Sequence, residues 1–203
     1  MNPIRILVAD DQSLIRSGLV WLLQREPDFN IVAEVSRGDE ILDACVTHAV
    51  DVALVDLQMP GIDGIEACRQ VKETRPETRV LIVTMYGRPG YVRRASQSGA
   101  EGFLIKDTPI ARLAQAIRQV HTGERVIDPA LAADSIFSGE SPLSSRETEI
   151  LRLAGEGVSA GEIARQLSLA EGTVRNHLSS AIRKTETESR AQAFWVADRN
   201  GWL

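Results

Sequence analysis

Five polar residues of this sequence stand at positions where they could form one charged site. They lie directly after short apolar runs of the chain, and they are Asp10, Asp11, Asp56, Thr84 and Lys106. A carboxylate can act as a nucleophile and become an aspartyl-phosphate, and grouped carboxylates bind a hard cation such as Mg²⁺. A lysine and a threonine can then contact the phosphoryl oxygens. Carboxylates after strands also cap helices, but that alternative explains a single Asp better than five residues in this order.

The elements that must position these residues alternate between strand and helix. Short runs rich in Val, Ile and Leu predict buried parallel strands, at Ile4–Ala9, Ile31–Val35, Val52–Val55, Val80–Val83 and Gly102–Ile105. Amphipathic stretches between them predict helices, at Leu14–Gln24, Asp39–His48, Ile65–Glu73, Tyr91–Ser98 and Arg112–His121. Five such units predict an α/β fold, a doubly wound, flavodoxin-like sheet of five parallel strands. Ligands of such sheets bind at the carboxyl ends of the strands, so we expect the five polar residues to converge there.

Length, composition and charge favour two small domains. The 203 residues carry a formal charge of -5; residues 1–141 hold 15 Lys/Arg and 20 Asp/Glu, and residues 142–203 hold 8 of each. An acidic part followed by a neutral part indicates two domains with different roles. The two cysteines are too few for a disulfide framework, no apolar run approaches the ~20 residues of a membrane span, and the N-terminus lacks a secretory signal. We therefore expect a cytoplasmic protein with no membrane partner.

The second domain is expected to be all helical. Residues 122–142 are rich in Gly, Pro, Ser and Asp and are predicted to be a linker, with a candidate short helix over Asp128–Phe137. Capping-box spacings at Ser144–Glu147 and Ser159–Glu162 mark two helix starts. Two further helices follow, the last over about Arg190–Arg199. The predicted domains are therefore residues 1–121, an α/β domain, and residues 143–203, a four-helix domain.

The first domain resembles the receiver domains of bacterial response regulators. The resemblance rests on Asp10-Asp11, Asp56-Leu57-Gln58-Met59-Pro60-Gly61, Thr84 and Lys106, across about residues 4–121. It implies that Asp56 accepts a phosphoryl group from a histidine kinase, while Thr84 and Lys106 contact that group. Mg²⁺ would be held by Asp10, Asp11, Asp56 and the backbone carbonyl of Gln58. Phe103 matches the aromatic switch position, so the expected switch residues are Thr84 and Phe103.

The second domain resembles the LuxR-type helix-turn-helix domain over essentially all of residues 142–203. The matching segments include Leu143–Glu147, Glu162–Ala164, Thr173–His177 and Arg190–Ala193. The resemblance implies that Glu171–Arg183 is a recognition helix in the major groove of DNA. Arg175 and Asn176 would face base edges, because arginine suits guanine and asparagine suits adenine. The residues nearer to phosphates would be Thr173, His177, Ser179, Arg183 and Lys184, although a structural role for His177 is an equal alternative.

Both halves together resemble the NarL/FixJ family of response regulators. This implies a transcription factor of a two-component system, and not an enzyme. Phosphorylation of Asp56 would promote dimerisation through the Tyr91–His121 surface and the C-terminal helix, and with it binding to promoter DNA. RNA polymerase is a further candidate partner. The neutral second domain predicts few phosphate contacts, so useful DNA affinity should depend on the dimer.

Three departures from the family pattern carry expectations of their own. Met85 stands where a small residue is common, and its bulk should hinder attacking water and slow autodephosphorylation. Ala170 replaces a common Ser before the recognition helix, and the loss of an N-cap typically costs ~1 kcal/mol. Thr185 and Thr187 replace two apolar residues, which should weaken the packing of the last helix.

Three alternatives remain open from the sequence. An orphan regulator would bind DNA independently of phosphorylation, and the bulk of Met85 leaves this alternative open. A phosphatase of the same α/β type would use Asp56 as its nucleophile, but Gln58 stands where its second acid/base carboxylate is expected. A protein-interaction module would never contact DNA. A gel-shift experiment on residues 142–203 with promoter DNA separates this alternative from a DNA-binding domain.

Overall fold

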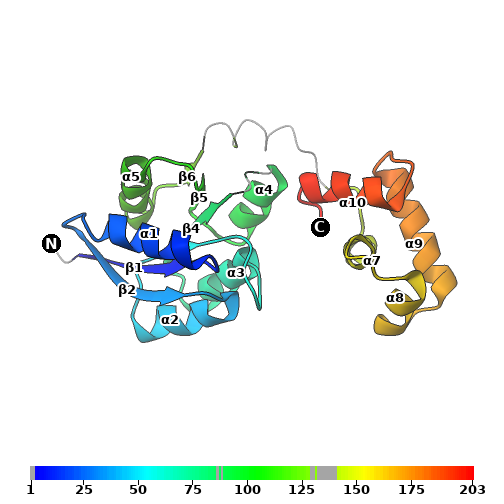
Figure 1. Ribbon diagram of the computed structural model, residues 1–203, viewed down its shortest axis with the longest axis horizontal. Helices are drawn as coiled ribbons and strands as arrows, with labels where there is room; N and C mark the ends of the chain where they lie inside the picture. The colour runs from blue at the N-terminus through cyan, green and yellow to red at the C-terminus, as the bar shows by residue number, and fades with distance from the viewer. Residues whose placement is uncertain (1–2, 86, 88, 129–130, 132–140) are drawn as a thin grey trace. The chain divides into compact units, whose positions relative to one another are not determined.

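The computed structural model describes residues 3–85, 87, 89–128, 131 and 141–203. These residues form two compact units, one built around a sheet and one built of helices (Figure 1). Most of the candidate helix over 128–137 lies outside the described residues. Within the described ranges, no helix combines the length and apolar character needed to cross a bilayer.

The first unit is a parallel sheet with the strand order β2-β1-β3-β4-β5-β6. Every neighbouring pair is parallel, which confirms the predicted doubly wound α/β architecture. The strands are β1 (Ile4–Ala9), β2 (Phe29–Val35), β3 (Val52–Val55), β4 (Arg79–Thr84), β5 (Gly102–Ile105) and β6 (Val126–Ile127). The prediction of five strands was wrong, because β6 lies in the predicted linker. Two residues are too short for a periodic signal, and β6 forms because its backbone can pair with the open edge of β5.

Helices cover both faces of the sheet. They are α1 (Ser13–Leu23), α2 (Ile41–Thr47), α3 (Gly64–Thr74), α4 (Pro89–Gln97) and α5 (Ile110–His121), with a short 3₁₀ turn, η1 (Gly38–Glu40), before α2. Apolar side chains of α1 and α5 share one buried cluster with the strands. Figure 1 shows α2 and α3 on the opposite face of the sheet. The strands buried between two helical layers explain why their sequences read as continuous apolar runs.

The second unit consists, within residues 141–203, of four helices around one apolar core. They are α7 (Ser145–Gly155), α8 (Ala160–Gln166), α9 (Glu171–Lys184) and α10 (Arg190–Arg199). Both predicted capping boxes are present, at Ser144 and at Ser159. The buried face of α9 carries Val174, Leu178 and Ala181 against α7, α8 and α10. This leaves the opposite face of α9 open to solvent.

Candidate functional site

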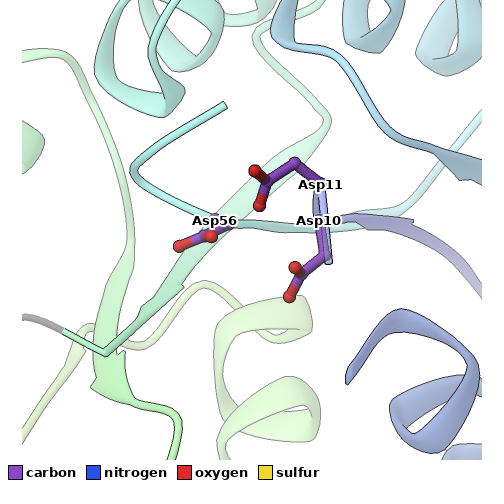
Figure 2. A group of neighbouring side chains, drawn as sticks. All are labelled: Asp10, Asp11 and Asp56. Carbon is purple, nitrogen blue, oxygen red and sulfur yellow. The ribbon is translucent and has the colours of Figure 1, made fainter. Parts of the chain in front are cut away.

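The five polar side chains predicted to converge do so at the carboxyl ends of β1, β3, β4 and β5. The Lys106 Nζ lies 2.7 Å from Oδ2 of Asp10 and 2.9 Å from Oδ2 of Asp56. Carboxylate oxygens of Asp10, Asp11 and Asp56 lie within 4.8 Å of one another, and Figure 2 shows these side chains leaving neighbouring chain segments. Thr84 and Asp56 line one pocket. Parallel strands that end in register therefore bring together residues separated by almost a hundred positions in the chain.

The backbone of the strand ends fixes these side chains. The Asp56 N–H donates to the carbonyl of Ala9 over 2.9 Å, and the Lys106 N–H donates to the carbonyl of Thr84 over 2.8 Å. The Asp56 Oδ1 accepts the Leu57 N–H at 2.7 Å. Because Oδ2 of the same carboxylate contacts Lys106, both of its oxygens are oriented.

The ionisable groups at the centre of this site are almost completely buried. Asp10, Asp56 and the Lys106 side chain are 2%, 5% and 4% exposed. Burial raises the pKa of Asp56 above its usual value, although the hydrogen bond from Lys106 opposes this. Burial also disfavours the charged amine of Lys106, but the carboxylates of Asp10 and Asp56 outweigh it and raise the pKa of Lys106. The cluster brings together three carboxyl groups, two of which contact the one amine of Lys106, so its acidic groups outnumber its basic ones.

The donor set fits a hard divalent cation. Three carboxylates offer oxygen ligands, which hard cations prefer, and their oxygens are already close together. The uncompensated negative charge would be balanced by such an ion. Asp11 is exposed while Asp10 and Asp56 are buried, so the cluster is accessible from one side.

A pocket opens on Asp56 from the solvent side. It is lined by Asp11, Gln12, Asp56, Gln58, Thr84 and Met85. Met85 is 56% exposed, so its side chain stands at the mouth of the pocket and not in the core. The sequence reasoning did not identify Gln12, whose N–H donates to Oδ1 of Asp10 at 3.0 Å. Its position directly after the acidic pair was the available signal.

Both expected switch residues are buried in this structure. Thr84 is 1% exposed at the end of β4, and Phe103 is 2% exposed on β5. Register places Ile105 beside Thr84 and Phe103 beside Ile82. A hydroxyl at the site and an aromatic ring in the adjacent strand therefore lie in one packed layer.

The predicted DNA-contacting residues lie on the outer part of α9. Arg175, Asn176, Ser179, Arg183 and Lys184 are exposed, and Thr173 and His177 are half-buried. The half-buried position of His177 suits either of the roles expected for it. No side chain caps α9 at Ala170. Thr185 is buried, and its hydroxyl donates back to the carbonyl of Ala181 at 2.9 Å.

Two of these basic residues contact acidic side chains that the sequence reasoning did not identify. The Lys184 Nζ lies 2.7 Å from Oε2 of Glu147, which is only 5% exposed. The same carboxylate oxygen accepts the Ser144 N–H at 2.7 Å. Burial opposes the charge of Glu147, but the hydrogen bonds from Lys184 and Ser144 prevail and lower its pKa to about 2. The start of α7 is thus tied to the end of α9.

Arg175 takes part in a second pair on the open face of α9. Its Nη2 lies 2.6 Å from Oε1 of Glu171, one helical turn earlier, and both side chains are exposed. Such surface pairs contribute only about 0.3–0.5 kcal/mol. The contact with Glu171 therefore orients the Arg175 guanidinium, and breaking it in favour of another partner would cost little free energy.

Comparisons with known proteins match both units of the chain. The family model "Response regulator receiver domain" matches residues 6–118, and "Bacterial regulatory proteins, luxR family" matches residues 141–197. The chain is 38% identical to "Transcriptional regulatory protein DesR" of Bacillus subtilis (strain 168), over 98% of this chain and 99% of that protein. It is 34% identical to "Probable transcriptional regulatory protein NarL" of Mycobacterium tuberculosis (strain ATCC 25618 / H37Rv), over 100% and 97%.

A solved structure extends the likeness over the whole chain. The response regulator ChrA of a heme-sensing two-component system is 32% identical, covers 100% of both chains and gives a TM-score of 0.60. The receiver match covers most of the sheet unit, and the luxR match covers α7, α8, α9 and most of α10. This chain therefore belongs to the response regulators that join a receiver domain to a LuxR-type DNA-binding domain and regulate transcription.

Proposed function

We propose that Asp56 accepts a phosphoryl group from a histidine kinase, and that this controls binding to promoter DNA. The observation that carries the proposal is the buried contact of Lys106 with both Asp10 and Asp56 beside an open pocket. A carboxylate that is oriented through both oxygens, next to a cationic donor and a hydroxyl, is suited to become an aspartyl-phosphate.

In the transfer, a carboxylate oxygen of Asp56 attacks the phosphorus of the phosphohistidine. The new oxygen–phosphorus bond forms as the nitrogen–phosphorus bond breaks, and the electron pair of that bond leaves with the histidine. Lys106 and the hydroxyl of Thr84 donate hydrogen bonds to the phosphoryl oxygens. Asp10, Asp11, Asp56 and the carbonyl of Gln58 would hold Mg²⁺, which when bound supplies positive charge against the phosphoryl oxygens.

The added charge biases the switch. A phosphoryl group brings about -1.5 to -2 charges to Asp56, and Thr84 and Phe103 reorient in response. This changes the surface of α4, β5 and α5, over Tyr91–His121, and two receivers associate through it. The C-terminal helix α10 supplies the second dimer contact. A transcription factor that binds bacterial promoters acts in the cytoplasm, which is the compartment we propose.

Two copies of α9 then enter successive major grooves about one DNA turn apart. Arg175 and Asn176 read base edges, and Thr173, His177, Ser179, Arg183 and Lys184 lie near phosphates. An ammonium has three donors, so the contact of Lys184 with Glu147 leaves donors for a phosphate. RNA polymerase at the promoter is the further partner that we propose.

Phosphorylation and DNA binding are tested on the same samples. The full chain is incubated with Mg²⁺ and acetyl phosphate, intact mass counts the phosphoryl groups, and a gel shift with DNA from its own promoter region follows. We expect one phosphoryl group per chain, a dimer by sedimentation and tighter DNA binding, all absent from Asp56→Asn. Equal phosphoryl incorporation in Asp56→Asn would exclude Asp56 as the acceptor.

A second candidate is an orphan regulator that binds DNA without phosphorylation. Met85 favours it, since its 56% exposed side chain stands at the mouth of the pocket through which a phosphodonor must approach. Under this alternative, wild type and Asp56→Asn would bind DNA equally, with or without acetyl phosphate.

A further inference from the structure

The chain after α5 folds back onto the edge of the sheet instead of leaving the receiver. It turns at Gly123, whose φ of +91° favours glycine. Val126 then pairs with Gly102, and Ile127 pairs with Phe103. We call Val126–Asp128 together with Leu131 the strap.

The backbone of the strap holds the strand that carries Phe103. The Val126 N–H donates to the carbonyl of Glu101 over 2.9 Å, and the Asp128 N–H donates to the carbonyl of Phe103 over 3.1 Å. The β4 strand pairs with the other edge of β5. Phe103 can therefore not shift its backbone without changing the hydrogen bonds of the strap.

The side chains of the strap reach a second part of the switch. Leu131 is 7% exposed, and its methyl groups pack on the backbone of Gly87 beside Ile105. A Cβ at Gly87 would lie 2.4 Å from a methyl group of Leu131, so any larger residue at this position would push the Leu131 side chain from its place. Gly87 follows Thr84 by three residues, and Ile105 directly precedes Lys106. Gly87 and Ile105 form the surface on which Leu131 packs, and we call them the seat of Leu131. They lie in the two segments that carry the expected phosphoryl-binding residues.

The strap also shares a small pocket with the switch aromatic. Ile127 and Phe103 line it together with Val92 and Ala95 of α4. Val126 is 5% exposed and belongs to the apolar core of the receiver. The strap thus contacts the switch region at the β5 backbone and at Gly87, and its Ile127 borders the pocket beside α4.

We propose that the strap is a moving part of the switch, docked on the unphosphorylated receiver and loosened by phosphorylation of Asp56. This rests on the proposed function. When Thr84 moves toward a phosphoryl group, the segment through Gly87 moves with it, and the seat of Leu131 changes. Only two residues of β6 pair with the sheet, so the loss of this seat releases the strap. Because the chain runs on from the strap to the DNA-binding domain, release changes how far that domain can move from its own receiver.

Hydrogen exchange of the full chain tests this directly. Exchange of the Val126 and Asp128 amides is measured with Mg²⁺, before and after acetyl phosphate, and intact mass counts the phosphoryl groups in each sample. We expect phosphorylation to speed exchange of both amides on the order of tenfold. The exchange rates of the β1 amides, which β3, β4 and β5 separate from β6, should not change. In Asp56→Asn the strap amides should exchange at the slow rate throughout.

A pair of variants separates the strap from general destabilisation. Leu131→Ala should speed strap exchange without phosphorylation and raise the DNA affinity of the unphosphorylated chain toward the phosphorylated value. The control Val20→Ala truncates a side chain of similar exposure, 8%, in α1, and should leave both quantities unchanged.

The outcomes distinguish the two proposals. Two results would overturn the proposal for the strap alone. One is a single phosphoryl group per chain with unchanged exchange of the strap amides. The other is a Leu131→Ala variant that binds DNA as wild type does in both states. No phosphoryl incorporation would overturn the proposed function, and the role of the strap with it.

Discussion

Replacing Lys106 by Met tests whether the acidic site is held together by one buried charge. Methionine keeps most of the apolar stem of the lysine and removes its ammonium. The Nζ contacts Asp10 at 2.7 Å and Asp56 at 2.9 Å, and all three side chains are at most 5% exposed. Removal of one partner from a buried ion pair typically costs 3–5 kcal/mol, because a charge is left uncompensated.

Protonation of Asp56 sets an upper limit to that loss. Its pKa is already above the ordinary 3.8. A carboxyl group with a raised pKa needs less free energy for protonation at neutral pH than an ordinary one, so protonation limits the loss. We expect Lys106→Met to lower the free energy of unfolding of the receiver by about 3 kcal/mol at neutral pH. The loss should shrink as the pH falls, since the variant then needs less free energy to protonate Asp56.

Mg²⁺ should recover part of this loss. Without Lys106 the cluster carries one more uncompensated negative charge, so a bound cation gains more, and a ligand that binds the folded state stabilises it by mass action. The control is Lys72→Met, which removes a partly buried amine that pairs with Glu101 away from the acidic site. That variant should also lose stability, but Mg²⁺ should stabilise it no more than it does wild type.

Urea denaturation in a Trp195→Phe, Trp202→Phe background measures these differences. Trp21 is then the one remaining tryptophan of the three in the sequence, and its fluorescence follows the receiver. A loss below about 1 kcal/mol at neutral pH, or an equal gain from Mg²⁺ in wild type and Lys106→Met, would refute the reasoning.

Three further predictions concern Asp56, Met85 and Glu147. Because the folded-state pKa of Asp56 is raised, its ionisation lowers stability as the pH rises above about 4; Asp56→Asn should therefore stabilise the receiver at neutral pH, and urea midpoints that do not diverge from wild type between about pH 4 and pH 7 would contradict this. Met85→Ala should shorten the phosphoryl lifetime several-fold by opening the pocket, as followed by intact mass. The control Val46→Ala, which truncates an exposed apolar side chain of α2, should not. Equal lifetimes in Met85→Ala and wild type would contradict the role of Met85. The pKa of Glu147, about 2, lies below its ordinary 4.5, so its stabilisation is present above 4.5 and lost as the pH falls toward 2; Glu147→Gln should cost the helical unit about 1.5–3 kcal/mol near neutral pH, and thermal melts with the same acid sensitivity as wild type would argue against it.

The residues of the acidic site could be identified from the sequence because the fold repeats one simple rule. Each buried strand is an apolar run, and each run ends at the same edge of a parallel sheet. The positions of Asp10, Asp56 and Lys106 relative to those runs therefore predicted their convergence, and the structure has them within hydrogen-bonding distance. The helices were predictable for a similar reason, since α5 and α9 each bury a regular apolar stripe.

Contacts between segments remote in the chain were not predictable. The two residues of β6 have no periodic signal, and their strand exists only because the edge of β5 accepts them. Nothing near Glu147 in the sequence indicates that Lys184, thirty-seven positions away, neutralises it.

The sequence by itself determined the two units, their fold classes and the convergence of the acidic cluster, because these follow from local periodicity and from residue types at strand ends. Only the tertiary structure decided that the segment after α5 pairs with the sheet, and that Leu131 packs on Gly87 beside Ile105. The physical reason is that edge pairing and side-chain packing depend on surfaces that exist only after the sheet has formed.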